Sequence, residues 1–349
     1  MLMRVFPWLI AGLALLLGVM FPWMKTPLII ALSYGFAALG VSMLIRAGQV
    51  SFGHAGFTCL AGYAVVAISR AYPQTDGFVL MLIGALAGLL SGAVVGLFMM
   101  RYRGIFFGML NLALSMVLFA VLGKFYNLTG GTDGLRMERP PFLGQVLERA
   151  AFETWLLVVS AVLVVGACWL MQRFYASPTG QALRALKSNE VRLEYLGISA
   201  HRVFLTGYIA SATLCGFSGG MFALIQGLVT PEMGYWVRSG EYVFIAVLGG
   251  TVSPVGAFLG AIAFEFLKLF AAATMTGAWQ LVIGVVLLIL IFVAPGGLVT
   301  LFARFAGSTL KGAWQIIMGA VLLALIFVAP RGLAPLLARL DRRAKPSQD

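Results

Sequence analysis

The chain has 349 residues, of which 61% are hydrophobic and only 10% are charged. A soluble domain cannot bury that much apolar surface, so the composition excludes a water-soluble globular protein and indicates an integral membrane protein. The net charge of +12 does not predict nucleic-acid binding. The basic residues cluster at the ends of apolar runs, where loops meet an anionic cytoplasmic leaflet.

Apolar runs long enough to cross a lipid bilayer recur along the chain. A hydrocarbon core about 30 Å thick needs roughly 20 residues of helix. The first run lacks a small-residue cleavage site and leads directly into the second, so we interpret it as a span and not as a signal peptide. The runs predict an all-α polytopic helical bundle of about 9–11 membrane segments, including discontinuous or re-entrant helices. The candidate spans are 5–22, 27–45, 50–69, 78–100, 104–123, 154–172, 203–228, 243–272, 278–295 and 313–329.

The stretch 46–56 places three polar side chains among glycines at the start of a span. Gln49, Ser51 and His54 are costly in lipid, and such groups usually turn toward the inside of a bundle. The glycines permit a break whose exposed amides would face a carboxylate, which makes these residues candidates for a path through the membrane. Alternatively, the glycines allow close helix packing and His54 bonds a neighbouring carbonyl.

Two further pairs of polar residues lie inside apolar runs. Asn111 and Ser115 are four residues apart and share a helix face. They would either line the same path or join two helices by hydrogen bonds worth about half a kcal/mol or more each. Glu265 is followed by Lys268 and is the one carboxylate deep in an apolar run. We favour an intrahelical pair that reaches the inner surface over the centre of a proton-coupled transporter.

Two long connections differ in charge and predict the orientation of the chain. Connection 124–153 carries four basic and four acidic residues. Connection 173–202 carries five basic and two acidic residues, for a net charge of +3 (5 − 2). Because basic loops stay in the cytoplasm, 173–202 is expected inside and 124–153 outside. Counting spans backward then places the N-terminus in the cytoplasm.

The charged segment 177–199 has the pattern of one short amphipathic helix. Ser177 and Pro178 suit the N-cap and first helical positions, and Gly197 suits the C-terminal stop. Such an element between spans is expected to contact a soluble partner, the alternative being a helix that inserts its leucines among lipid headgroups. The predicted apolar face contains Ala182, Leu183, Leu186, Leu193 and Leu196, and the predicted wet face contains Arg184, Lys187, Glu190, Arg192 and Glu194.

The last third of the chain contains an interrupted apolar run and a repeat. The glycines and proline in 249–256 interrupt the run 243–272, so a discontinuous or re-entrant helix is predicted there. Segment 277–298 recurs as 312–333 with 16 of 22 positions identical, which indicates a tandem-duplicated helix. Both copies precede basic residues, so the charge pattern does not decide on which side of the membrane the C-terminus lies. We therefore predict one transmembrane domain, 1–333, followed by a basic C-terminal tail, 334–349.

Three motifs occur in a fixed order along the chain. They are GQVSFGHAGF at 48–57, LTGGTDGL at 128–135, and TGQALRALKSNE followed by LGI within 179–198. Together they resemble the permease subunits of ABC importers for branched-chain amino acids, and the resemblance covers most of 26–298. Two features depart from that family. The second repeat copy, 312–333, lies beyond the usual end of such chains, and the last motif is a loose version of the Glu-Ala-Ala…Gly pattern of ABC permeases.

The resemblance implies a non-catalytic subunit of a multi-subunit importer in a bacterial inner membrane. Its partners would be a paralogous permease, two cytoplasmic ATPases and an extracytoplasmic substrate-binding protein. The chain itself would bind no cofactor, because ATP and Mg²⁺ would sit on the ATPases, and the sequence has no GxxxxGK[ST] motif. The cargo would be branched-chain or related small amino acids, with urea, short amides or aromatic acids as alternatives. A secondary transporter is disfavoured because intramembrane carboxylates are scarce.

The resemblance also assigns roles to two groups of residues, and no catalytic or metal site is expected. The three cysteines form no CxxC pair. The turn-rich outer loop is a gate or a dock for the binding protein, or else a plain turn. Its residues are Thr129, Gly130, Gly131, Thr132 and Asp133. The residues expected to couple the chain to the ATPases are Gly180, Arg184, Asn189, Glu190, Glu194 and Gly197.

Overall fold

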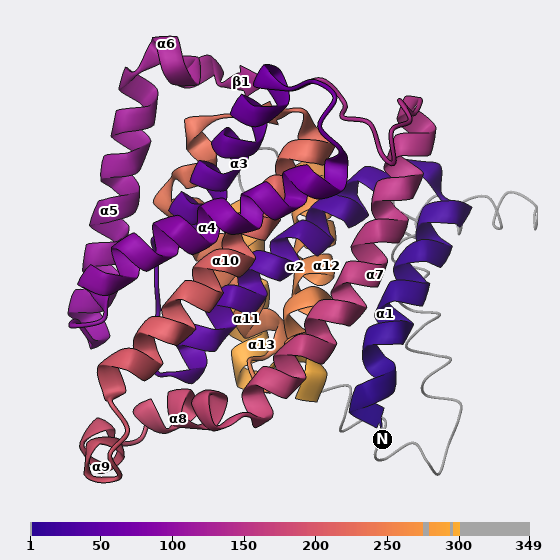
Figure 1. Cartoon of the computed structure of the whole chain (residues 1–349). Helices are drawn as coiled ribbons and strands as arrows, with labels where there is room; N and C mark the ends of the chain where they lie inside the picture. Colours follow the sequence, from indigo (N-terminus) through magenta and orange to yellow (C-terminus); the bar gives the residue numbers. More distant parts are fainter. Residues whose placement is uncertain (1, 275–278, 294–295, 301–349) are drawn as a thin grey trace, which may run out of the picture.

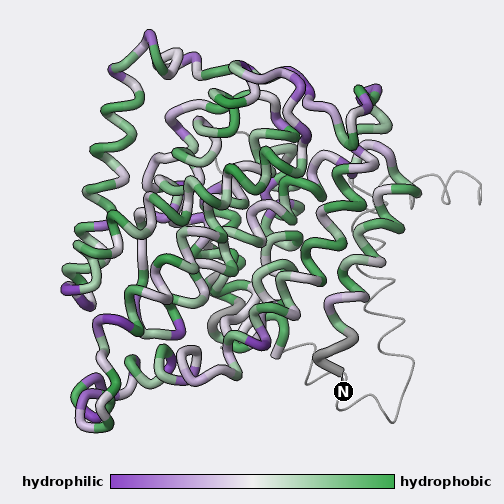
Figure 2. The backbone as a smooth tube through the Cα atoms, in the orientation of Figure 1, coloured by the Kyte–Doolittle hydropathy of each residue, from purple (hydrophilic) through white to green (hydrophobic). Residues whose placement is uncertain are grey.

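The computed structural model describes residues 2–274, 279–293 and 296–300, which form an all-α bundle, as predicted (Figure 1). Hydrophilic residues gather at its two ends, and the helices between them are hydrophobic (Figure 2). Within the described residues, six helical segments are long and apolar enough to cross a membrane. They are Pro22–Arg46, Gly77–Met99, Gly104–Lys124, Arg149–Ala176, Ala200–Gln226 and Pro254–Ala273.

Most elements follow one another with short connections, and a longer segment, 137–148, joins β1 to α7. The first half contains α1 (Leu2–Met20), η1 (Pro22–Met24), α2 (Lys25–Arg46), α3 (His54–Ala71), α4 (Gly77–Met99), α5 (Gly104–Lys124), α6 (Tyr126–Thr129), η2 (Gly131–Asp133) and β1 (Leu135–Arg136). The second half contains α7 (Arg149–Ala176), α8 (Pro178–Leu186), α9 (Glu190–Tyr195), α10 (Ala200–Gln226), β2 (Leu228–Val229), η3 (Pro231–Gly234), α11 (Trp236–Gly249), α12 (Pro254–Thr274) and α13 (Trp279–Val293).

The two long connections lie at opposite ends of the bundle. Helices α8 and α9 lie at one end, together with the start of α1, and α6 and β1 lie at the other end (Figure 1). At that second end β1 pairs antiparallel with β2, with Leu135 opposite Val229. This separation agrees with the charge-based topology, whereas the side of the membrane that each end faces stays a prediction.

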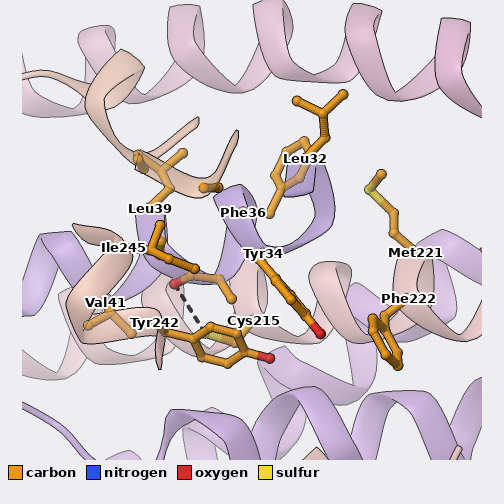
Figure 3. Packing of buried hydrophobic residues seen from close by; sticks show 14 of the residues in the cluster. Leu32, Tyr34, Phe36, Leu39, Val41, Cys215, Met221, Phe222, Tyr242 and Ile245 are labelled. Carbon is orange, nitrogen blue, oxygen red and sulfur yellow. Dashed lines mark hydrogen bonds between the residues drawn. The ribbon is translucent and has the colours of Figure 1, made fainter. Parts of the chain in front are cut away.

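Helix α2 is the core of the molecule. Its residues from Leu28 to Leu44 are all buried, as expected for a helix that is apolar on every side. Aromatic side chains of α2 pack against α10 and α11 (Figure 3). The Tyr34 ring stacks on Phe222 of α10 at 5.7 Å between ring centroids, and it lies 5.8 Å from the ring of Tyr242 of α11.

Helix α4 packs on α10 through glycines. Gly84, Gly88 and Gly92 recur every fourth residue, and a Cβ atom at any of them would meet α10 at Ala212 or Gly216. Leu82, Leu90 and Val94 of α4 are exposed instead, whereas Leu80 is buried. Small residues at every fourth position let two backbones approach closely, which is how membrane helices gain packing without a hydrophobic driving force.

Two breaks shape the interior of the bundle. The predicted interruption after residue 249 is confirmed: α11 ends at Gly249, and Gly250 has a left-handed φ of +92° before α12 begins at Pro254. Helix α11 starts at Trp236, earlier than the predicted 243–272 run. The predicted span 50–69 is wrong at its beginning, because α3 starts only at His54.

The described residues include helix only from the first copy of the repeat. Helix α13 lies within 277–298 and therefore agrees with a helix at that copy. The second copy, 312–333, and the basic tail, 334–349, lie outside the described residues.

Candidate functional site

The charged segment 177–199 forms two short helices, not the single helix predicted. Ser177 Oγ accepts the N–H of Gly180 and caps α8, as expected. Helix α8 ends at Leu186, and Asn189 Oδ1 accepts the N–H of Arg192 at 3.1 Å, which starts α9 as a separate helix. An N-cap residue favours non-helical backbone at its own position, so Asn189 explains the break.

The predicted faces of this segment are mostly correct. The first four of its five predicted apolar residues are buried, but Leu196, which directly follows the end of α9, is 71% exposed. Gly197 ends α9 with a φ of +77° and donates its N–H to the Glu194 carbonyl, as the C-terminal stop requires. Gly180 lies directly on the backbone carbonyl of Phe174, where any side chain would collide. Arg184, Asn189 and Glu194 are exposed.

An ion pair ties α9 to the connection between α4 and α5. Arg103 Nε donates to Glu190 Oε1 at 2.6 Å, and the Arg103 guanidinium lies 4.2 Å from the ring centroid of Phe204 on α10. Arg103 also donates to the carbonyls of Met100 and Tyr102. Glu190 therefore has a partner within the chain, and this pair links α9 to the α4–α5 connection. Sequence reasoning missed Arg103 because its partner lies 87 residues away.

A basic cavity of about 730 Å³ lies between α8, the end of α2 and the α11–α12 break. Arg46, Arg184 and Lys187 lie in its wall, and no described carboxylate lines it. Arg46, at the end of α2, donates to the carbonyls of Thr251 and Val252 in the α11–α12 break, at 3.3 and 3.1 Å. The cavity thus lies where α8 faces both the end of α2 and the interruption between α11 and α12.

The segment before α3 enters the bundle as non-helical chain along α5. Gln49 Oε1 accepts the N–H of Gly104, the first residue of α5, at 2.6 Å. Gly53 packs against the backbone of Asn111, seven residues or about 10 Å further along α5. Helix α3 consequently begins inside the bundle and not at its end, which is the break that the glycines of 46–56 permit.

The beginning of α11 meets the beginning of α3 at this depth. Ser115 Oγ donates to the Gly234 carbonyl at 2.6 Å, just before α11, and Ser239 Oγ of α11 accepts the N–H of Ala55 at 2.9 Å. Two discontinuous helices therefore direct their N-terminal ends into the bundle interior. Irregular backbone at membrane depth occurs only where protein buries it or where it lines a cavity.

The five predicted path residues are all buried, and each has a partner within the chain. Ser51 Oγ lies 2.6 Å from His54 Nδ1, while Asn111 accepts from the Tyr208 hydroxyl and donates to the Phe107 carbonyl. None of the five lines the 730 Å³ cavity beside α8. Of the side-chain polar atoms of these five residues, His54 Nε2 is buried without a hydrogen-bond partner among the described residues. These contacts agree with the helix-joining alternative, and a direct role in the path stays a prediction.

A network of charged side chains lies within the membrane-spanning part of the bundle. Arg238 Nη1 donates to Glu241 Oε2 at 2.6 Å and to the Tyr34 hydroxyl at 2.9 Å. Lys268 Nζ of α12 approaches Glu241 Oε1 at 3.4 Å. Glu241 is 6% exposed and Glu265 is 7% exposed. Two carboxylates are therefore buried where one was predicted, and the expectation that Glu265 and Lys268 reach the inner surface as an intrahelical pair is wrong.

The outer loop is a compact turn. Thr129 is buried and donates to the carbonyls of Leu122 and Phe125, which fixes the end of α5. Gly130 and Gly131 both have left-handed φ angles, +71° and +57°, so their glycine identity is required by the backbone. Thr132 and Asp133 are exposed. The geometry accounts for the glycines as turn residues and leaves two polar side chains available to a partner.

A helical bundle with two chain breaks inside it, buried charges and a capped helix pair outside it is the architecture of a membrane transport protein. Residues 23–292 match the family described as "Branched-chain amino acid transport system / permease component", and the chain belongs to this family of transport subunits. None of the solved protein structures matches the chain.

The curated relatives are permeases with several different cargo names. The chain is 27% identical over 251 residues to the high-affinity branched-chain amino acid transport system permease protein LivM of Escherichia coli (strain K12), covering 66% of this chain and 59% of that protein. It is 23% identical over 265 residues to the probable permease LivH of Methanocaldococcus jannaschii, covering 74% and 84%. It is 28% identical over 255 residues to the guanosine ABC transporter permease NupP of Bacillus subtilis, covering 68% and 70%. The chain thus spans about six tenths of the length of LivM.

Proposed function

We propose that this chain is the permease subunit of an ABC importer for branched-chain or related small amino acids. The observation that carries the proposal is the capped α8–α9 pair. It lies outside the bundle, yet it contacts three places that lead into it: the end of α2, the α4–α5 connection and α10. A rigid element with such contacts transmits the closure of an ATPase to the membrane helices. The name of the LivM relatives supports the cargo.

The partners follow from this role. A paralogous permease completes the membrane part, two cytoplasmic ATPases with ATP and Mg²⁺ dock on the α8–α9 end, and an extracytoplasmic binding protein docks on the β1–β2 end. The α8–α9 end and the N-terminus then face the cytoplasm, in agreement with the charge of connection 173–202. The complex lies in a bacterial inner membrane. The chain contributes a path and not a catalytic site.

One observation favours a secondary transporter as the second candidate. Glu241 and Glu265 are both buried in the bundle. The scarcity of intramembrane carboxylates is therefore a weaker argument against a secondary transporter than the sequence suggested. A protonatable pair at that depth is what proton-coupled transport needs. The salt bridges of Glu241 to Arg238 and Lys268 oppose this reading, because they give this carboxylate a structural role within the chain.

Reconstituted vesicles separate the two candidates. The chain is purified with its genomic partner subunits, inserted into vesicles and supplied with binding protein and radiolabelled L-leucine. We expect uptake that requires ATP on the side of the membrane where the ATPases lie. A protonophore should leave this uptake unchanged. Uptake that ignores ATP and collapses with the proton gradient would establish the secondary transporter instead.

Reversing the charge of Glu194 is expected to uncouple the importer. Glu194 is exposed on α9 and has no ion-pair partner among the described residues, so Glu194→Lys leaves the fold intact. We expect the stimulation of ATP hydrolysis by loaded binding protein to fall about fivefold or more. The reversed charge at the edge of the contact would disturb its electrostatic complementarity with the ATPase. Glu194→Gln is the matched control for charge loss without reversal. Full stimulation in Glu194→Lys would remove α9 from the coupling surface.

A further inference from the structure

A second cavity, of about 400 Å³, lies between α5, η3 and the first turns of α11. Its volume is in the lower part of the range of small-molecule sites, about 300–1,000 Å³. Phe119 is one helical turn beyond Ser115, which bonds Gly234, so the cavity lies between the chain breaks and the β1–β2 end. Its lining residues are Phe119, Glu232, Tyr235, Val237, Arg238 and Glu241.

Arg238 provides a fixed positive group in this wall. Its hydrogen bonds to Tyr34 and Glu241 both use Nη1. The other guanidinium nitrogens bond no described residue. A guanidinium held in place by one terminal nitrogen still offers parallel N–H donors to a carboxylate, the geometry in which arginine binds that group best.

Glu232 provides the opposite charge. Its side chain is exposed, and among the described residues no cation lies within ion-pair distance of its carboxylate. The same cavity therefore carries a cation whose orientation is fixed and an anion without a partner. A cargo without charged groups would use neither Glu232 nor the remaining guanidinium nitrogens of Arg238, whereas a molecule with a carboxylate and an ammonium group would match both.

The remaining wall is apolar and aromatic. The rings of Phe119 and Tyr235 lie 5.2 Å apart between centroids, and Val237 is beside them with 38% of its surface exposed. Such a wall accepts an aliphatic side chain, and aromatic faces also attract an ammonium group.

We propose that this cavity is a binding site for a zwitterionic α-amino acid with an apolar side chain, on its way from the binding protein to the chain breaks. Arg238 binds the carboxylate, Glu232 binds the ammonium group, and Phe119, Tyr235 and Val237 contact the side chain. Glu241 is a positioning residue that holds Arg238. The proposal rests on the proposed function in one respect, namely that the cargo is an amino acid.

A cysteine-labelling assay tests the site without transport. Val237→Cys is introduced into the full complex, in which the three native cysteines of this chain are buried. The rate of its modification by a charged methanethiosulfonate reagent is measured with and without L-leucine. We expect L-leucine to slow labelling about fivefold or more, and 4-methylpentanoate and isoamylamine, which each lack one charged group, to slow it less than about twofold.

Substitutions test which side chains bind the two charged groups of the amino acid. Glu232→Gln breaks no ion pair of the described residues, so it is the decisive variant, and we expect it to abolish protection by L-leucine. Arg238→Gln is expected to do the same but also removes a partner of Glu241. Glu138→Gln, which alters another exposed carboxylate outside the cavity, is the matched control and should keep full protection.

The outcomes separate this inference from the proposed function. ATP-driven leucine uptake without protection at Val237→Cys, or equal protection by leucine and 4-methylpentanoate, would overturn the cavity as a zwitterion site and leave the importer intact. Protection that depends on Glu232, in a complex that shows no ATP-driven uptake, would keep the site and overturn the importer. Absence of both protection and uptake would overturn both.

Discussion

Replacing Gly88 by leucine is expected to prevent α4 from packing on α10 and to remove most of the folded protein. A Cβ atom at Gly88 would collide with the Ala212 carbonyl and lie 2.8 Å from the Gly216 Cα atom. Both obstacles are backbone, so no flexible side chain can move aside. Overpacking of this kind costs about 3 kcal/mol or more. The measurement is the yield of monodisperse protein in detergent and its midpoint of thermal unfolding.

Gly166→Leu on α7 is the matched control for this change. Gly166 is also a glycine inside a long membrane helix, but a Cβ atom there would meet nothing within 4 Å. It is expected to leave yield and unfolding temperature close to those of the parent chain. Equal behaviour of Gly88→Leu and Gly166→Leu would show that α4 and α10 do not pack through their glycines.

The helices were predictable because the bilayer fixes their length. Apolar runs of roughly 20 residues have few alternatives to a spanning helix, and the long α4, α5 and α10 helices lie within a few residues of their predicted ranges. The interruption after Gly249 was predictable for a similar local reason, because glycines and a proline within eight residues cannot continue a helix. Local chemistry also predicted the Ser177 cap and the Gly197 stop.

The non-helical segment before α3 was not predictable, because its contacts go to distant residues. Gln49 bonds Gly104, 55 residues away, and Gly53 fits against Asn111. An apolar run such as 50–69 looks the same whether it starts as helix or as extended chain, since periodicity does not report on partners. The division into α8 and α9 was overlooked for another reason: the apolar positions on both sides of Asn189 fit one continuous helical face.

The candidate site was only partly visible in the sequence. The coupling residues and the outer loop came from a family resemblance, and their functional roles stay predictions. Arg238 and Glu241 were missed because they precede the predicted span 243–272 and looked like loop residues. Their partners, Tyr34 and Lys268, lie 204 and 27 residues from them. Tertiary structure alone turns these scattered charges into a network.

Removing the carboxylate of Glu241 tests that network and is expected to be the most damaging single change among the charged residues. Glu241→Ala leaves Arg238 and Lys268, whose side chains are 23% and 25% exposed, without their shared counter-charge. Losing one partner of a buried pair costs about 3–5 kcal/mol, because the remaining charge stays desolvated. Thermal unfolding in detergent measures the loss. The additional change Arg238→Met should restore part of the stability, because it removes one of the two positive charges that Glu241 balances.

The pair of Arg149 and Glu153 is the matched control for Glu241. Its Nε–Oε1 distance of 2.9 Å is also that of a salt bridge, but the Arg149 side chain is 73% exposed. Glu153→Ala is therefore expected to cost less than about 1 kcal/mol, since water replaces the lost partner. Equal losses in Glu153→Ala and Glu241→Ala would mean that water reaches Glu241. The Arg238 guanidinium would then not be held in place, and the charge complementarity of the 400 Å³ cavity would lose its physical basis.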